Sequence, residues 1–268
     1  MAEKVNPVQA SKAVLIEVMN VLGLYRDNLI LIGGWVPELL LPNRGHMGSL
    51  DVDLAVDVRG ISRQQYDTIL HRLIEAGYTQ APNGFLRRVK GAQEPVKLDL
   101  ITGEYVDDAA SRVPARLQEI LLGKLRGTDL AFEVFEEISV TGEMPDGGTN
   151  TVKLRIVRIE AFIVMKAFAM SDRTKAKDAY DIYFCLKHFP AGVAELAKLY
   201  RPILQNGLVQ EGLAGLRDKF RSNDAVGPIW AAQVAEENGA DRDLAQREAF
   251  ELMKDFLAAI EENSKSGA

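Results

Sequence analysis

The strongest constraint on the fold is a change in the hydrophobic pattern near residue 158. Before this point, short apolar runs and alternating segments typical of strands are interspersed with helical patterns. After it the spacing is almost entirely helical, over residues 159–170, 175–188, 191–204, 207–220 and 241–261. Mixed elements followed by helices alone are typical of an α+β protein. We therefore expect an N-terminal domain (1–157) with a mixed β-sheet flanked by helices, and a C-terminal helical domain (158–268).

The N-terminal part contains both kinds of element. Helical spacing covers residues 8–23 and 62–76, and a short helix is expected in the segment WVPELLL. Apolar runs or strict alternation predict strands over residues 28–32, 50–58, 85–90, 96–102, 131–140 and 152–157.

The composition excludes several classes of protein. No apolar run approaches the roughly 20 residues that cross a bilayer, and the first residues lack the apolar core of a secretory signal, so we expect a cytoplasmic protein with no membrane partner. The net charge of −6 argues against a protein that coats nucleic acid without specificity. Cys185 is the single cysteine. With His188 it supplies only two of the roughly four ligands of a structural zinc, so we expect a half-buried helical thiol.

Two consecutive glycines, Gly33 and Gly34, follow the apolar run 28–32. Glycines at such a junction let the backbone pass close to a ligand, and the free N–H groups at the start of a helix favour an anion such as phosphate. The same residues could instead form only a tight strand-to-helix turn. Both interpretations stay open on the sequence alone.

Three aspartates lie on predicted strands. Asp51 and Asp53 are two residues apart, so their side chains share one face, where two carboxylates repel each other unless a cation lies between them. Magnesium binds such oxygen ligands together with substrate phosphates. Asp99 is the only acid in the apolar strand VKLDLIT. If the two strands are neighbours, three carboxylates converge, enough for two metal ions and a general base; otherwise all three acids could be solvent-facing.

The helical half contains a second candidate group. Lys166 is the only charged residue in the helical segment AFIVMKAFAM. A buried ammonium requires a carboxylate, a phosphate or a route to solvent. Arg173 and Lys177 follow, and Asp178 and Asp181 share a helix face three residues apart.

The order of these features resembles the nucleotidyltransferase superfamily typified by DNA polymerase beta. There a Gly-Gly or Gly-Ser turn and the serine bind the triphosphate, and three strand carboxylates hold two divalent metal ions. The matching residues here are Gly33, Gly34, Ser49, Asp51, Asp53 and Asp99. The resemblance implies that residues 1–157 form a catalytic domain built on a nucleotidyltransferase-type sheet.

The second half is similar to the AbiEii/AbiGii toxins of type IV toxin–antitoxin systems. In those proteins a helix with one lysine is followed by an arginine and then by Lys-Asp-x-x-Asp-Ile/Leu-Tyr. The pattern matches Lys166, Arg173, Lys177, Asp178 and Asp181, and the resemblance spans roughly residues 28–188. This chain has Gly48-Ser49-Leu50 before the metal pair, where relatives more often have an Arg-x-Ser/Thr run; Arg44 and His46 are the candidates to replace that arginine.

The resemblance implies a magnesium-dependent enzyme with two metal ions, in which manganese could substitute. It would move a nucleoside monophosphate from an NTP to an acceptor hydroxyl and release pyrophosphate. Asp51, Asp53, Asp99 and Lys166 would be catalytic. The residues that would bind nucleotide are Gly33, Gly34, Ser49, Lys166, Arg173, Lys177, Asp178 and Asp181. The helical domain would contribute to nucleotide and acceptor binding. It further implies tRNA, or another molecule such as a protein, as the acceptor, and is compatible with a cognate antitoxin as partner.

Three other functions compete with this one. An antibiotic nucleotidyltransferase of the aminoglycoside type would use an acidic acceptor site, for which Glu104, Asp107 and Asp108 are available. A non-catalytic nucleotide-binding protein would be expected to have lost a carboxylate. A metal-dependent nuclease would need a further histidine or acid in the metal shell, and the only histidine near the motif is His46.

Overall fold

The computed structural model describes residues 5–57, 60, 63–82, 84–103, 116–117, 120–121 and 123–265. The chain forms two compact units. We call Met1–Val36 with Gly48–Arg158 the sheet unit, and Pro37–Met47 with Ile159–Ala268 the helical unit. Each unit is described by itself.

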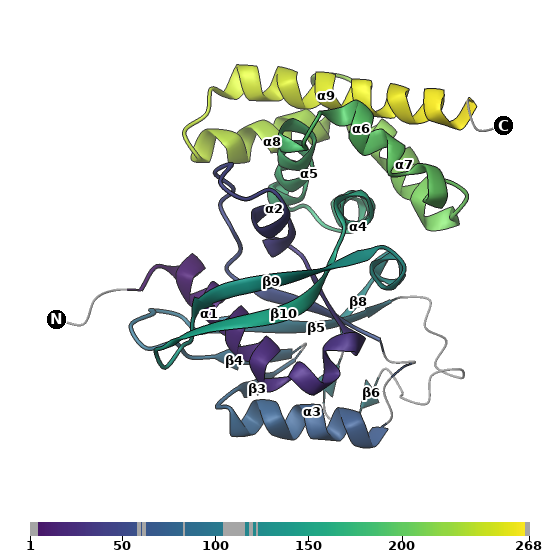
Figure 1. Ribbon diagram of the computed structural model, residues 1–268. Helices are drawn as coiled ribbons and strands as arrows, with labels where there is room; N and C mark the ends of the chain where they lie inside the picture. The colour runs from purple at the N-terminus through teal and green to yellow at the C-terminus, as the bar shows by residue number, and fades with distance from the viewer. Residues whose placement is uncertain are drawn as a thin grey trace. The chain divides into compact units, whose positions relative to one another are not determined.

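A mixed eight-stranded sheet forms the core of the sheet unit, with the strand order β3-β4-β5-β2-β1-β10-β9 and β8 paired to β5 (Figure 1). Its strands are β1 (Leu29–Ile32), β2 (Val52–Val56), β3 (Thr79–Ala81), β4 (Gly84–Arg87), β5 (Val96–Gly103), β8 (Gly123–Leu125), β9 (Phe135–Glu143) and β10 (Thr149–Val157). A separate two-stranded sheet contains β6 (Arg116–Leu117) and β7 (Ile120–Leu121).

The centre of the sheet is built from its most apolar strands. Every residue of β1 is buried, as expected for a strand covered on both faces. β1 is antiparallel to β2, and β2 is parallel to β5. In this register Asp53 is paired with Ile32 on one side and with Asp99 on the other.

Helices cover the sheet and connect its strands. α1 (Pro7–Val21) begins where the Asn6 side chain accepts a hydrogen bond from the Val8 N–H at 2.8 Å, and its apolar residues contact β9, β10, β5 and β2. The other helices are α3 (Arg63–Glu75) and the 3-10 helices η1 (Gly23–Asn28) and η2 (Thr128–Phe132). The two units divide within α2 (Trp35–Leu40).

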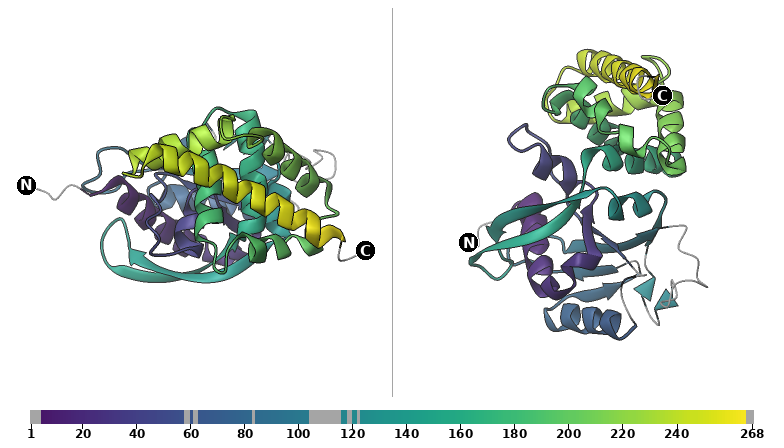
Figure 2. Two further views of the ribbon diagram at one scale, coloured as in Figure 1. Left: turned by 90° about the horizontal axis from the view of Figure 1, so that it is seen from above. Right: turned by 45° about the vertical axis from the view of Figure 1, so that its right-hand side comes forward.

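The helical unit packs around α4, whose residues 159–170 are all buried. Its elements are α4 (Ile159–Asp172), α5 (Ala176–His188), α6 (Val193–Lys198), η3 (Arg201–Ile203), α7 (Gly207–Lys219), α8 (Val226–Glu237) and α9 (Arg242–Lys265). The long α9 crosses the unit and contacts α5, α6 and α8 (Figure 2).

The observed elements confirm the predicted fold class, a mixed sheet with flanking helices followed by helices. Several details differ from the sequence-based expectation. The strand expected over 131–140 begins only at Phe135, because residues 128–132 form the 3-10 helix η2. The helix expected over 191–204 breaks into α6 and η3, because Pro202 has no N–H to continue the ladder. β2 begins at Val52, so Leu50 lies outside the strand and is 59% exposed instead of on its apolar face. α8 was not expected, because it carries glycine and proline in its first turn. The short strand β3 was not expected either.

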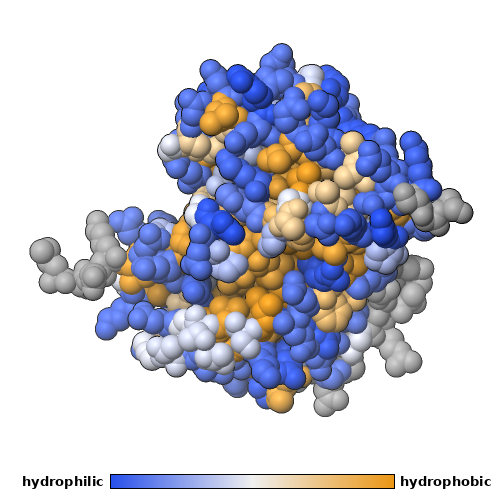
Figure 3. Space-filling model, turned by 45° about the horizontal axis from the view of Figure 1, so that its top comes forward, coloured by the Kyte–Doolittle hydropathy of each residue, from blue (hydrophilic) through white to orange (hydrophobic). Residues whose placement is uncertain are grey.

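No helix in the described residues is long and apolar enough to cross a membrane. The face shown in Figure 3 is largely hydrophilic, with smaller apolar areas between the polar side chains. The large exposed hydrophobic side chains are Leu24, Leu50, Ile74 and Leu244.

Candidate functional site

Gly33 is required by the position of the Asp53 carboxylate. Gly33 has a φ of +73°, in the left-handed region that favours glycine. A Cβ atom at this position would lie 2.0 Å from Oδ2 of Asp53. The glycine turn therefore makes room for the aspartate on the neighbouring strand. α2 begins directly after Gly34 and has six residues, and the predicted binding of phosphate by Gly33 and Gly34 stays a prediction.

The three predicted carboxylates belong to the sheet unit. Asp53 and Asp99 are paired in register on the parallel strands β2 and β5, so the condition set by the sequence, that these strands be neighbours, is met. Asp51 comes one residue before β2. Its carbonyl accepts a hydrogen bond from Ser11 Oγ at 3.4 Å, and Ser11 Oγ accepts one from the Trp35 indole N–H at 3.1 Å. Helix α1 thus supports the backbone that carries Asp51.

Lys97 lies among these acids. It is two residues before Asp99 on β5, and its Nζ is 2.8 Å from Asp99 Oδ2. Burial would lower the pKa of Lys97, but the hydrogen bond and charge of Asp99, together with the charges of Asp51 and Asp53, raise it above its usual value. The other oxygen of Asp99, Oδ1, is buried with no hydrogen-bond partner in the described structure.

The donor chemistry of this group suits a hard divalent cation, since all its ligand atoms would be carboxylate oxygens. The buried, unpartnered Oδ1 of Asp99 is a further sign of a missing positive partner. As placed, the described side chains include no group of three or more His, Cys, Asp or Glu that could hold a metal ion. Asp99 is instead neutralised by Lys97.

The second predicted group forms an ion-pair network inside the helical unit. Lys166 of α4 lies 2.7 Å from Oδ1 of Asp178 and 2.7 Å from Oδ2 of Asp181, both on α5. Arg173 donates two hydrogen bonds to Asp178, at 2.8 and 2.9 Å. Lys177 contacts Asp181 at 3.0 Å. The buried ammonium of Lys166 is therefore paired with carboxylates.

His46 completes this network. Its Nε2 is 3.1 Å from Oδ1 of Asp181, and neither side chain is exposed. The imidazole also packs against Tyr180 and Phe184. His46 is thus engaged with Asp181, while Arg44, the other candidate to replace the family's arginine, is exposed.

Burial and pairing act in opposite directions on the pKa values of this network. Burial would raise the pKa of both carboxyls, but the charge of Lys166 and hydrogen bonds from the other donors hold the pKa of Asp178 and Asp181 below the usual range. The same carboxylates raise the pKa of Lys166 against the effect of burial. For Lys177 burial dominates and lowers the pKa. Lys166 is therefore held charged.

The remaining predicted residues are dispersed. Ser49 is half-buried in the segment before β2. Cys185 is a buried free thiol, more buried than the half-buried position expected of it. Arg87, a basic residue of β4, pairs with Glu17 at 2.7 Å and with Asp146 at 3.2 Å. Glu104, Asp107 and Asp108 lie outside the described residues.

Sequence reasoning missed two residues of the sheet-unit site. Lys97 could have been found, because a residue two positions before Asp99 on a strand shares its face. Ser11 gave no signal, since a serine within an apolar helix has no pattern that ties it to residue 51.

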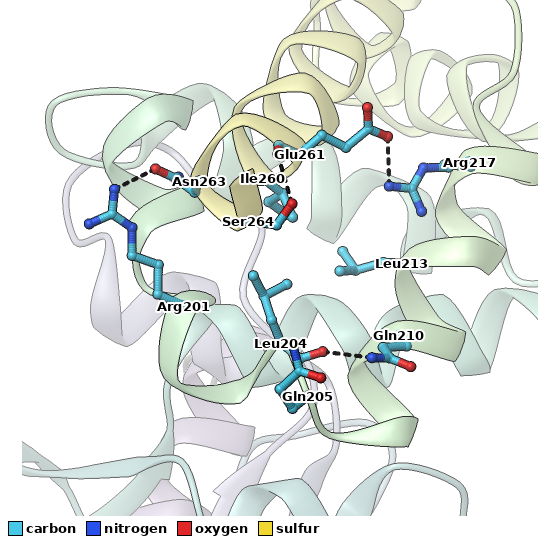
Figure 4. Close-up of a pocket in the computed structure, with 10 residues that line it drawn as sticks. All are labelled: Arg201, Leu204, Gln205, Gln210, Leu213, Arg217, Ile260, Glu261, Asn263 and Ser264. Carbon is cyan, nitrogen blue, oxygen red and sulfur yellow. Dashed lines mark hydrogen bonds and ion pairs between the residues drawn. The ribbon is translucent and has the colours of Figure 1, made fainter. Parts of the chain in front are cut away.

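Two hollows lie away from the predicted site residues. One, of about 640 Å³ in the helical unit, has Leu204, Leu213 and Ile260 in its lining, with Arg201 bonded to Asn263 and Arg217 bonded to Glu261 (Figure 4). The other, of about 750 Å³ in the sheet unit, is lined by residues that include Lys12, Lys90 and the turn between β9 and β10. None of the predicted site residues lines either hollow.

Comparison with known proteins identifies the family. Residues 21–262 match the family described as nucleotidyl transferase AbiEii toxin, type IV TA system. Because this match covers most of the chain, the chain belongs to the AbiEii family. The family predicted from the sequence is thereby confirmed. A crystal structure of a candidate nucleotidyltransferase from H. pylori is similar at 16% identity and a TM-score of 0.43, over 94% of this chain and 97% of that one. No curated protein matches the chain.

Proposed function

We propose that this AbiEii-family chain transfers a nucleoside monophosphate from an NTP to an acceptor hydroxyl. Family membership implies a nucleotide substrate and an antitoxin partner. The observation that supports catalysis is the register of Asp53 with Asp99, with Asp51 two residues before Asp53. The register supports convergence of Asp53 and Asp99, and the proposal adds Asp51 from the residue just before β2 as the third carboxylate.

Asp51, Asp53 and Asp99 would hold the divalent metal, Mg²⁺ or Mn²⁺, with two ions in the complete site. The metal would supply Lewis acidity, which neutralises phosphate charge and lowers the pKa of the acceptor hydroxyl. Gly33 keeps the Asp53 carboxylate in place, because any larger residue would collide with it.

The chemistry is an in-line displacement at the α-phosphorus. The acceptor oxygen forms the new P–O bond, the bond to the β-phosphate bridging oxygen breaks, and pyrophosphate leaves. The acceptor proton would pass to a carboxylate. Asp99 is our candidate, because its Oδ1 accepts no hydrogen bond within the described chain.

The helical unit would provide the cations for the polyphosphate. Lys166 would neutralise charge as pyrophosphate forms, with Arg173 and Lys177 beside it. Asp178 and Asp181 would fix the direction of Lys166, as their 2.7 Å ion pairs indicate. Gly34 and Ser49 would hydrogen-bond the phosphates.

The proposed acceptor is tRNA, which the resemblance to the toxin family favours. Nothing in the described residues favours the aminoglycoside alternative. The nuclease alternative is weakened because His46, the histidine available for a metal shell, is engaged with Asp181. Retention of all three carboxylates weakens the non-catalytic alternative.

The test is a transfer assay with Mg²⁺, each labelled NTP in turn and total tRNA. The matched variants are the double substitution Asp51→Ala with Asp53→Ala, and Glu136→Gln, which alters an exposed acid on β9. Label on tRNA with the natural chain and Glu136→Gln, and none with the double variant, would support the proposal. Label that persists in the double variant would refute the role of these aspartates. If no label appears on tRNA but label is transferred to another acceptor, tRNA would be wrong as the acceptor and the rest of the proposal would stand.

A further inference from the structure

We propose that Lys97 is a built-in counter-ion of the carboxylate group, which a divalent cation must displace from Asp99 in order to bind. This inference rests on the proposed function, because it concerns the same three aspartates. It assigns a role to a residue outside the set predicted from the sequence.

Geometry places Lys97 at the acids. Lys97 and Asp99 project from the same face of β5, and Nζ lies 2.8 Å from Oδ2 of Asp99. Asp53 is paired with Asp99 across the strand boundary. The ammonium therefore lies beside Asp99, whose register partner on the neighbouring strand is Asp53.

The charge balance explains why a cation is needed. Three carboxylates brought together without a positive charge repel one another, which destabilises the folded chain. Lys97 supplies one positive charge directly to Asp99. A divalent ion would supply twice that charge to the same oxygens and would compete with the ammonium.

Lys97 is able to leave. Its side chain is 42% exposed, against 17% for Asp99, and it stands on a flexible aliphatic stem. Because the lysine side chain is half-exposed, water can solvate its ammonium when it rotates away from Asp99. Displacement thus requires a side-chain rotation and no rearrangement of the strand.

The consequence is a reduced intrinsic affinity for metal. A bare group of carboxylates would hold the cation without competition, whereas here each metal ion must first release the lysine. Removing the charge of Lys97 should therefore tighten metal binding, while replacing it by another cation should not.

The experiment measures binding of Mn²⁺ alone, without nucleotide, by electron paramagnetic resonance. The proteins are the natural chain, Lys97→Met, Lys97→Gln, Lys97→Arg and the control Lys153→Met, which alters an exposed lysine of β10. Lys97→Met and Lys97→Gln are expected to bind Mn²⁺ about tenfold more tightly, as expected for one charge in partly solvated surroundings. Lys97→Arg and Lys153→Met should stay within about threefold of the natural chain.

A second readout is the melting temperature of the same proteins. Without metal, Lys97→Met should melt at a lower temperature than the natural chain, because Asp99 loses its ion-pair partner. Saturating Mn²⁺ should raise its melting temperature by more than that of the natural chain. Both readouts are independent of transfer activity.

The outcomes separate this inference from the proposed function. Unchanged or weaker Mn²⁺ binding in Lys97→Met and Lys97→Gln would overturn the role of Lys97 and leave the metal site intact. Failure of every protein to bind Mn²⁺ would overturn both proposals. Tighter binding that also appears in Lys153→Met would overturn the inference, because it would reflect net charge alone.

Discussion

The two charged clusters of this chain differ in how their charges are balanced. In the helical unit, Lys166, Arg173 and Lys177 surround two fully buried aspartates, so the cations are in excess. In the sheet unit, Lys97 pairs with Asp99 on the strand beside Asp53, and the three predicted acids outnumber this lysine. The first balance suits a polyphosphate and the second suits a metal ion. This contrast underlies the different roles proposed above for the two clusters.

The clusters also differ in burial and therefore in what a substitution should change. Asp178 and Asp181 are inaccessible and fully paired, so their loss would expose uncompensated buried charge. The sheet-unit acids are half-buried. Changes in the helical unit should therefore affect stability first, and changes in the sheet unit should affect activity first.

The largest expected effect is on activity in the sheet unit. Asp53→Asn should reduce transfer by at least about 10³-fold, since it removes charge from the centre of the carboxylate group. The free energy of unfolding should change little, because repulsion among the acids is relieved. Single-turnover assays and urea denaturation of the same samples would measure both. Retention of more than a tenth of the activity would contradict the assignment of Asp53.

The next effect is on stability in the helical unit. Asp181→Ala leaves His46, Lys166 and Lys177 around a missing carboxylate, and we expect a loss of about 3–5 kcal/mol in the free energy of unfolding. Urea denaturation measures it, with Asp218→Ala, an exposed acid of α7, as the matched control. If Asp181→Ala loses no more stability than the control, the helical-unit cluster does not differ from the sheet-unit cluster in its effect on stability.

A smaller effect should appear at the glycine turn. Gly33→Ala places a methyl group against the Asp53 carboxylate and forces a positive φ on alanine, at a cost of about 1–3 kcal/mol. Activity should fall because Asp53 must move. The control is Gly147→Ala, which also has a positive φ but an open environment. Equal activity in the two variants would show that Asp53 tolerates displacement.

The smallest effect is on the pH dependence of stability. Because pairing lowers the folded-state pKa of Asp178 and Asp181, their stabilisation is complete above the ordinary carboxyl pKa of 3.8 and is lost as the pH falls towards the lowered values. We expect the free energy of unfolding to decline below about pH 4. Asp181→Asn should show a shallower decline over pH 2.5–5 in urea titrations. If the free energy of unfolding declines equally with pH in Asp181→Asn and in the natural chain, the contribution of Asp181 to the pH dependence would be refuted.

The sequence was sufficient for elements whose local pattern decides their structure. The alternation around Asp53 predicted β2, and the apolar run before Gly33 predicted β1. Whether β2 and β5 are neighbours depends on the strand order, which no local sequence pattern contains. The sequence therefore allowed Asp53 and Asp99 to converge but could not predict that they do. His46 and Asp181 are 135 positions apart, a separation at which sequence spacing says nothing about contact.

The segment Pro37–Met47 has a consequence for how the chain folds. It belongs to the helical unit, although it is flanked by residues of the sheet unit. During synthesis His46 cannot contact Asp181 until the ribosome has added the 135 residues that lead to it. The helical unit is therefore a discontinuous folding unit, and a fragment of residues 158–268 would lack the imidazole that contacts Asp181.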